Sequence, residues 1–180
     1  SAKQFVSCNW VPSIITEEDL VNAAAIGTLG PQAVLKWRAP GNECPPTPKE
    51  GEVIVFFDHM ARGFSPPGSK FFRDVLAAFQ LHPQDIGPNS DQTSATSKSS
   101  AKYLQEEPNI LLFREFFYLN RQNEFTNGPT LELGAVSIQR RRDSIFPYAC
   151  LPSHPKDWNK TWFYCKDTSP ADEHPLPGLH

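Results

Sequence analysis

Hydrophobic residues recur at helical spacing in three stretches of the chain. Residues 17–29 (EEDLVNAAAIGTL) follow Thr16, a favourable N-cap, and begin with acidic residues, as helices commonly do. Residues 70–82 (KFFRDVLAAFQLH) and 108–122 (PNILLFREFFYLNRQ) each place aromatic and aliphatic side chains on one wide face, and the first of these helices is predicted to begin near Pro67. Because both faces need cover, we expect these two helices to pack against each other.

Strand patterns lie between the first two predicted helices and after the third. A run of β-branched and aromatic residues at 52–57 (EVIVFF) predicts a buried strand. After a turn at Asn127-Gly128, apolar residues fall on about every second position from Leu131 to Ile138, which predicts paired strands. Residues 158–165 (WNKTWFYC) add a short aromatic strand. The order of elements predicts an α+β fold, with helices on one side of a small mixed or antiparallel sheet.

Three polar stretches connect or follow these elements. Residues 38–51 contain four prolines and two glycines, which predicts a loop. Residues 91–102 (DQTSATSKSSAK) carry no large apolar side chain, while the halves on either side each hold a helix and a β-rich stretch that need partners. We therefore expect a single domain over residues 1–165 with a flexible Ser/Thr-rich bridge at 91–102. Residues 166–180 are rich in proline and polar residues, which predicts a loosely held tail.

Size and charge narrow the class of protein. The chain has 180 residues, which suits one domain, and its net charge of −3 provides no overall basic field that would attract nucleic acid or an anionic membrane. No stretch approaches the roughly 18 consecutive apolar residues of a membrane helix, and the start SAKQFVSCNW lacks the layout of a signal peptide. We therefore expect an intracellular protein, cytoplasmic or nuclear, that does not enter a membrane.

The sequence carries no recognisable catalytic motif. It lacks the G-x-S-x-G elbow, the phosphate-binding loop, the dinucleotide fingerprint and the D-[ST]-G turn of retroviral-type aspartic proteases. Asp58 and His59 follow the predicted strand at 52–57, where catalytic groups often lie, but a carboxylate and an imidazole are also ordinary residues at a strand end. We expect no enzymatic activity.

Four cysteines are spread along the chain without a C-x-x-C pair. An intracellular location would keep them reduced, and each would then act as a small buried hydrophobic residue. The alternative is a metal site built from Cys150, His154, Cys165 and His174, whose spacing matches no standard zinc pattern. We expect neither a metal nor another cofactor.

Arg140, Arg141 and Arg142 form the densest positive cluster of the sequence. On a strand, Arg140 and Arg142 would share one face, so that two guanidinium groups could grip a phosphate or an acidic partner. The alternative is a solvated strand end or a charged edge that prevents sheet-to-sheet aggregation. Asp143 follows directly and weakens the cluster as a nucleic-acid site.

Trp158, Trp162 and Tyr164 form a second candidate contact surface, because they lie near Lys156 and Lys160 in the sequence. Exposed aromatic rings beside cations could stack on bases or on a partner. The alternative is that these large rings fill the core, since aromatic side chains supply much of the buried area of a domain.

Four long segments carry a resemblance to a known family. In chain order they are HMARGFSPPGSKFFRDVLAAFQLHPQDIGPNS, YLQEEPNILLFREFFYLNRQNEFTNGP, LELGAVSIQRRRDSIFPYA and SHPKDWNKTWFYCKDTSPADEHPLPG. Over about residues 10–177 the chain resembles the N-terminal, gag-like domain of plant gypsy-type retrotransposon proteins. The resemblance implies no catalytic site. It implies instead a region that assembles through protein-protein contacts and packages nucleic acid.

One segment departs from that family. Its members run from GPNS into an apolar, aromatic-rich helix that ends in YLQEEP, whereas this chain has the Ser/Thr-rich residues 91–102 there. The difference is a natural alternative, a recombined allele or an engineered replacement.

Three functions follow from these observations. The first, which we favour, is a module that self-associates or binds another protein. The second is a nucleic-acid packaging module. The third is a captured transposon fragment that acts in the host as a regulator or a toxic factor through a host protein partner.

Overall fold

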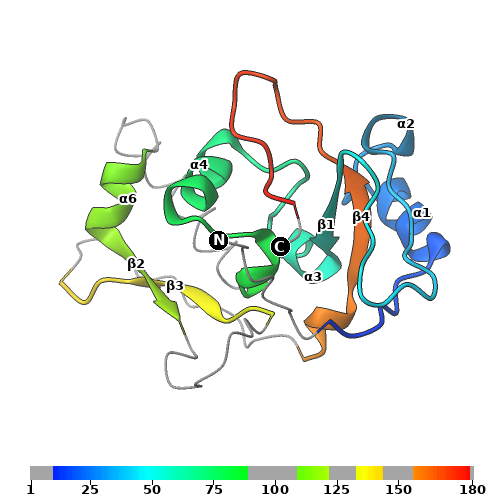
Figure 1. Ribbon diagram of the computed structural model, residues 1–180, viewed down its shortest axis with the longest axis horizontal. Coiled ribbons are helices and arrows are strands. Elements are labelled where there is room, and N and C mark those ends of the chain that lie inside the picture. The colour runs from blue at the N-terminus through cyan, green and yellow to red at the C-terminus, as the bar shows by residue number, and fades with distance from the viewer. Residues whose placement is uncertain (1–9, 89–108, 122–132, 144–155, 179–180) are drawn as a thin grey trace, which may run out of the picture.

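Two short antiparallel sheets organise the chain in the computed structural model, which describes residues 10–88, 109–121, 133–143 and 156–178. The strands are β1 (Glu52–Phe56), β2 (Phe117–Arg121), β3 (Val136–Arg140) and β4 (Trp162–Lys166); β1 pairs with β4 and β2 pairs with β3 (Figure 1). The α-helices are α1 (Glu17–Ala25), α2 (Gln32–Leu35), α3 (Phe57–Met60), α4 (Lys70–Phe79) and α6 (Ile110–Phe116). The described residues also contain two 3₁₀ helices, η1 (Pro83–Asp85) and η2 (Trp158–Lys160). The predicted α+β fold class is confirmed.

The β1–β4 sheet joins the two ends of the described chain. Glu52 lies opposite Lys166 and Phe56 opposite Trp162, and β1 is buried at every position except its first. The predicted buried strand is therefore confirmed for residues 52–56, whereas Phe57 already begins α3. The aromatic strand begins later than predicted, at Trp162, because residues 158–160 form a 3₁₀ turn before it.

The β2–β3 sheet shows where the sequence prediction was wrong. Residues 117–121 are not the second half of a helix but a strand, with Phe117 opposite Arg140 and Leu119 opposite Ile138. Helix α6 ends at Phe116, and the aromatic residues that follow have high strand propensity. Pairing with β3 therefore decides their conformation.

Helix α4 connects the two sheets through its side chains. Phe72 and Leu76 pack into the core beside β1 and β4, while Phe71 and Val75 pack with Phe113 of α6 and with β2 and β3. The predicted packing of the two amphipathic helices is confirmed. The helix begins at Lys70 after the N-cap Ser69, rather than near Pro67.

Helix α1 begins where predicted but is shorter than predicted. Thr16 accepts a hydrogen bond from the backbone N–H of Asp19, whose carboxylate accepts one from Thr16 N, so the two residues form a capping box. The helix ends at Ala25 and not near residue 29. Gly27, with a φ of +79°, makes the turn that follows.

The C-terminal segment packs more firmly than predicted. Leu176 is only 4% exposed, and its backbone N–H donates a 2.9 Å hydrogen bond to the carboxylate of Asp167. Glu173 forms an ion pair with Arg73 of α4, which is 3% exposed. An apolar anchor and an ion pair thus fix two points of residues 166–178, whose other side chains are mostly exposed.

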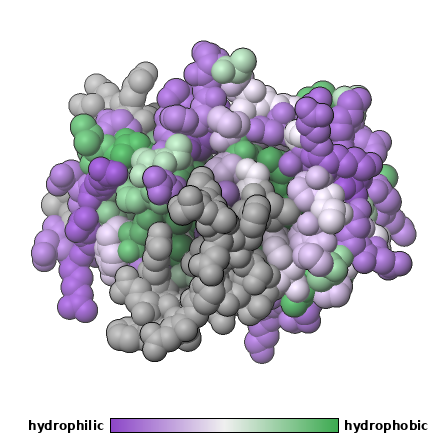
Figure 2. Space-filling view, viewed as in Figure 1, coloured by the Kyte–Doolittle hydropathy of each residue, from purple (hydrophilic) through white to green (hydrophobic). Residues whose placement is uncertain are grey.

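Hydrophobic side chains also reach the surface over α6. Figure 2 shows them gathered on the left side of the molecule, where α6 lies. Leu111 of α6 is 75% exposed and Tyr118 of β2 is 39% exposed.

The Ser/Thr-rich stretch at 91–102 and the Asn127-Gly128 turn lie outside the described residues, so the expectations for both stay predictions. Within the described ranges, no helix is both long enough and apolar enough to cross a membrane.

Candidate functional site

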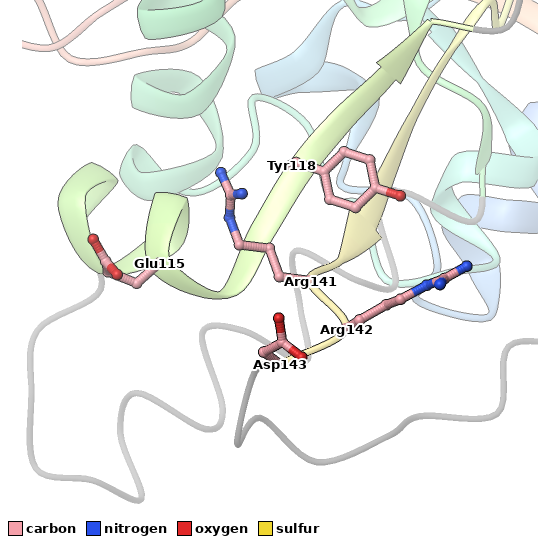
Figure 3. Close-up of a pocket in the computed structure, with 5 residues that line it drawn as sticks. All are labelled: Glu115, Tyr118, Arg141, Arg142 and Asp143. Atoms are coloured by element: carbon pink, nitrogen blue, oxygen red, sulfur yellow. The ribbon is translucent and has the colours of Figure 1, made fainter.

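An open pocket of about 390 Å³ lies where α6, β2 and the residues after β3 meet (Figure 3). Glu115 comes from α6 and Tyr118 from β2, and the chain beyond β3 supplies the remaining residues. The residues that line the pocket are Glu115, Tyr118, Arg141, Arg142 and Asp143. All five side chains are exposed to solvent.

Arg141 fixes the geometry of the pocket, because it closes the end of α6. Its backbone N–H donates a 2.8 Å hydrogen bond to the carbonyl of Phe116, and its Nε–H donates one of 2.8 Å to the carbonyl of Arg114. These carbonyls belong to the last turn of the helix, which leaves its C=O groups without partners inside the helix. The guanidinium thus stands between α6 and Tyr118, as Figure 3 shows.

Tyr118 forms the aromatic wall of the pocket. It lies opposite Gln139 in the β2–β3 register, and its hydroxyl donates a 2.7 Å hydrogen bond to the Gln139 side-chain oxygen. Gln139 in turn donates to the hydroxyl of Ser137 at 3.3 Å. This short chain of hydrogen bonds orients the phenol and leaves part of its ring in contact with solvent.

The pocket carries charges of both signs that do not neutralise one another directly. It holds the guanidinium groups of Arg141 and Arg142 and the carboxylates of Glu115 and Asp143. Among the described residues, no ion pair within 4.0 Å involves any of the four. The site can therefore offer hydrogen-bond donors to an anionic group and acceptors to a cationic group at the same time.

The arginine cluster of the sequence is only partly brought together. Strand β3 ends at Arg140, so Arg140 and Arg142 do not share a strand face as predicted. Arg140 is half-buried opposite Phe117 and does not line the pocket, whereas Arg141 and Arg142 both do. The chain leaves the strand after Arg140 because Arg141 bonds to the end of α6.

Two residues of the pocket escaped the sequence analysis as site residues. Glu115 and Tyr118 were assigned to one continuous helix over residues 108–122. A signal existed in the aromatic run that begins at Phe116, since such residues favour strands. Its pairing partner, however, lies about 20 residues further along the chain.

The aromatic candidates lie in the core. Trp162 and Tyr164 are fully buried and Trp158 is 7% exposed, so these rings form no contact surface in this fold. They pack with Phe56 of β1 and with Trp10, whose ring centre lies 5.6 Å from that of Trp162. Trp162 and Tyr164 are buried because they lie on β4, which pairs with β1, and Trp158 packs beside them from η2, in agreement with the alternative of core packing.

Asp58 and His59 lie at the start of α3, next to the turn that precedes β4. His59 is 4% exposed, and its ring lies 5.2 Å from that of Phe56 and 5.4 Å from that of Trp158. Asp58 accepts a 3.2 Å hydrogen bond from the hydroxyl of Thr161. The two side chains thus tie α3 to the turn before β4.

Cys44 and Cys165 lie within the described residues, whereas Cys8 and Cys150 do not. Cys150 and His154 of the conceivable metal set lie outside the described residues, and within the described ranges no group of three potential metal-ligating side chains comes together. Cys44 is exposed and Cys165 is buried. Burial, together with the nearby Asp167 and Glu52 carboxylates, raises the pKa of the Cys165 thiol to about 12. Cys165 therefore stays protonated, as a small hydrophobic residue does.

Comparison with known proteins relates part of the chain to transposons. Residues 53–121 match a family model described as "Putative gypsy type transposon". The match extends from β1 to the end of β2, so it includes Glu115 and Tyr118 of the pocket but not Arg141 to Asp143. No curated protein and no solved structure matches the chain.

Proposed function

We propose that this transposon-related domain is a non-enzymatic interaction module, which binds a segment of another protein or of a second copy of itself at the Glu115–Tyr118–Arg141–Arg142–Asp143 pocket. The observation that supports this best is the presence of two cations and two anions around one open pocket without direct pairing among them. A protein segment that carries both signs of charge can satisfy all four groups.

The carboxylates favour a protein partner over nucleic acid. A phosphate backbone would gain contacts with Arg141 and Arg142, but Glu115 and Asp143 line the same pocket and would repel it. Two arginines are also fewer than the phosphate contacts that tight nucleic-acid binding uses. The nucleic-acid packaging function is therefore the weaker candidate for this surface.

An exposed leucine beside the pocket supports the same choice. Leu111 precedes Glu115 by four residues on α6, so both lie on the same face of the helix, and Leu111 is 75% exposed. Protein interfaces combine apolar anchors with a polar rim. Leu111 and the ring of Tyr118 would supply the apolar contact, and the four charges would form the rim.

The test uses short random peptides displayed on phage and selected on the purified chain. Enriched peptides should combine acidic and basic residues with an apolar residue, and their affinity should fall by about tenfold or more in the Arg142→Glu and Leu111→Asp variants. Sedimentation equilibrium on the same proteins would report self-association. Both altered side chains are exposed, so thermal unfolding should show that each variant is folded.

Lys156→Glu is a suitable control, because it reverses an exposed charge outside the pocket. The proposal fails if the selected peptides bind Arg142→Glu and the parent chain equally well. It also fails if a single-stranded RNA oligonucleotide binds the pocket more tightly than any peptide, with an affinity that drops steeply as salt rises. That second outcome would favour the packaging function. A host protein bound through the pocket would favour the captured-fragment function.

A further inference from the structure

A proline-rich strip forms part of the surface between Arg38 and β1. Residues 45–49 read PPTPK, and three of the five are proline, whose ring fixes φ near −65°. A residue that precedes a proline is also restricted to extended conformations, which applies to Cys44, Pro45 and Thr47. Residues 46–49 form neither helix nor turn in the structure, and Pro45 lies in a bend just before them. The prolines thus restrict φ to values that the polyproline II conformation also uses.

The inner side of the strip is fastened to the domain. Pro46 is buried, the backbone N–H of Thr47 donates a 2.8 Å hydrogen bond to the hydroxyl of Tyr164, and the N–H of Lys49 donates one of 2.7 Å to the carboxylate of Glu52. The Thr47 hydroxyl donates to Glu43 at 2.8 Å. The strip is therefore held in place before any partner arrives, which lowers the entropy cost of binding.

The outer side of the strip offers prolines, carbonyls and one cation. Pro45 is exposed and Pro48 half-buried, and the three-residue period of a polyproline II segment would place these two rings on the same side. Among the described residues, none donates a hydrogen bond to the backbone carbonyls of residues 45–48. The ammonium group of Lys49 is exposed at the end of the strip.

We infer that residues 45–49 are a docking ligand for a protein domain with an aromatic-lined groove. Grooves of this class, found in SH3 and WW domains, hold two prolines of a P-x-x-P segment between aromatic rings. Their indole, phenol or amide groups would donate to the free carbonyls, and an acidic residue at the end of the groove would meet Lys49. Pro45 and Pro48 supply the two prolines at the required spacing.

The strip is a surface separate from the pocket. It precedes β1, and none of its residues lines the pocket at α6 and β2. The two proposals therefore stand on different side chains and can fail independently.

An array of purified SH3 and WW domains is the probe, and the whole folded chain is the analyte. At least one domain of the array should bind the chain, and a synthetic peptide spanning residues 43–52 should compete with that binding. The double variant Pro45→Ala/Pro48→Ala should bind at least about tenfold more weakly. Pro170→Ala changes an exposed proline elsewhere and should leave the affinity unchanged.

Lys49→Glu keeps the binding test informative if the proline changes disturb the loop. The Lys49 backbone N–H, which fastens the strip, remains in this variant. The new carboxylate near Glu52 should lower the unfolding temperature slightly, but the variant should stay folded and bind more weakly. The inference is overturned if no domain of the array binds the chain. It is equally overturned if both variants keep the parent affinity while remaining folded. Arg142→Glu should not affect this binding, which separates it from the pocket.

Discussion

Arg38 and Tyr164 are stacked on each other, with the guanidinium carbon of Arg38 3.9 Å from the centre of the Tyr164 ring. Their backbones exchange two hydrogen bonds of 3.0 and 3.1 Å, and both side chains donate to the same carboxylate, that of Glu43, at 2.9 and 2.7 Å. Arg38 also donates two hydrogen bonds to Glu52, of 2.8 and 2.9 Å. This network holds the loop at 38–51 against the β1–β4 sheet.

Removing the Tyr164 hydroxyl should destabilise the protein. In Tyr164→Phe, the carboxylate of Glu43 loses a donor and the N–H of Thr47 loses its acceptor, which should lower the free energy of unfolding by about 1–3 kcal/mol. Tyr118→Phe is the matched control, because its hydroxyl bonds to Gln139 at the surface, and the change should be within about 0.5 kcal/mol. Urea unfolding of both variants measures the difference. Equal effects would show that the buried network contributes nothing of its own.

Stability should fall in acid because of Glu43. The hydrogen bond from Tyr164, with further ones from Thr47 and Arg38, lowers the pKa of Glu43 from 4.5 to about 2 in the folded protein. Folding therefore favours the ionised carboxylate, so its contribution is complete above pH 4.5 and is lost as the pH falls toward 2. Urea unfolding at a series of pH values should show a smaller loss in Glu43→Gln than in the parent chain. A parallel loss in both proteins would contradict the assignment.

Gly134 should tolerate no side chain. A Cβ atom there would lie 2.5 Å from Cζ2 of Trp158, and the φ of +72° adds backbone strain. Gly134→Ala should cost about 1–3 kcal/mol more than the strain alone. Gly41→Ala measures that strain, because Gly41 has a φ of +62° with no atom within 4 Å of the added Cβ, and should cost about 1–2 kcal/mol. Thermal unfolding that ranks the two variants equally would refute the steric explanation.

Glu173→Gln should loosen the C-terminal segment. Arg73 is 3% exposed and would lose its charged partner, which costs about 3–5 kcal/mol for a fully buried pair. The side chain of Glu173 is itself 23% exposed, so we expect a smaller loss of about 2 kcal/mol. Limited proteolysis should cut this variant after residue 166 faster than the parent chain. Asp172→Asn, an exposed neighbour, serves as the control and should resist proteolysis as the parent does.

Sequence patterns predicted the structure correctly where they were compatible with only one type of secondary structure. The aliphatic and aromatic run in β1 and the wide apolar face of α4 are buried as their patterns indicated. The segment from Phe113 to Leu119 was ambiguous, because its apolar residues satisfy helical spacing as well as strand alternation. Register with β3, with Leu119 opposite Ile138, selects the strand for residues 117–121. Such long-range pairing cannot be derived from a local pattern.

The candidate site depended on the same pairing. The arginine cluster was visible in the sequence, but only the contact of Arg141 with the end of α6 brings Glu115 and Tyr118 beside it. Conversely, the sequence alone did not decide whether the rings of Trp162 and Tyr164, which lie near lysines, form a contact surface or fill the core. Their place on β4, with β1 on one side and the Arg38 bridge on the other, buries them.

The strand pairing limits which fragments of this chain can form both sheets. The segment related to transposons, residues 53–121, contains β1 and β2, whereas their partners β4 and β3 lie beyond it. A fragment that ends at residue 121 would therefore leave β1 and β2 without partner strands, and unpaired strands promote aggregation. A fragment that keeps both sheets must extend at least through residue 166, well beyond the stretch that matches the family model.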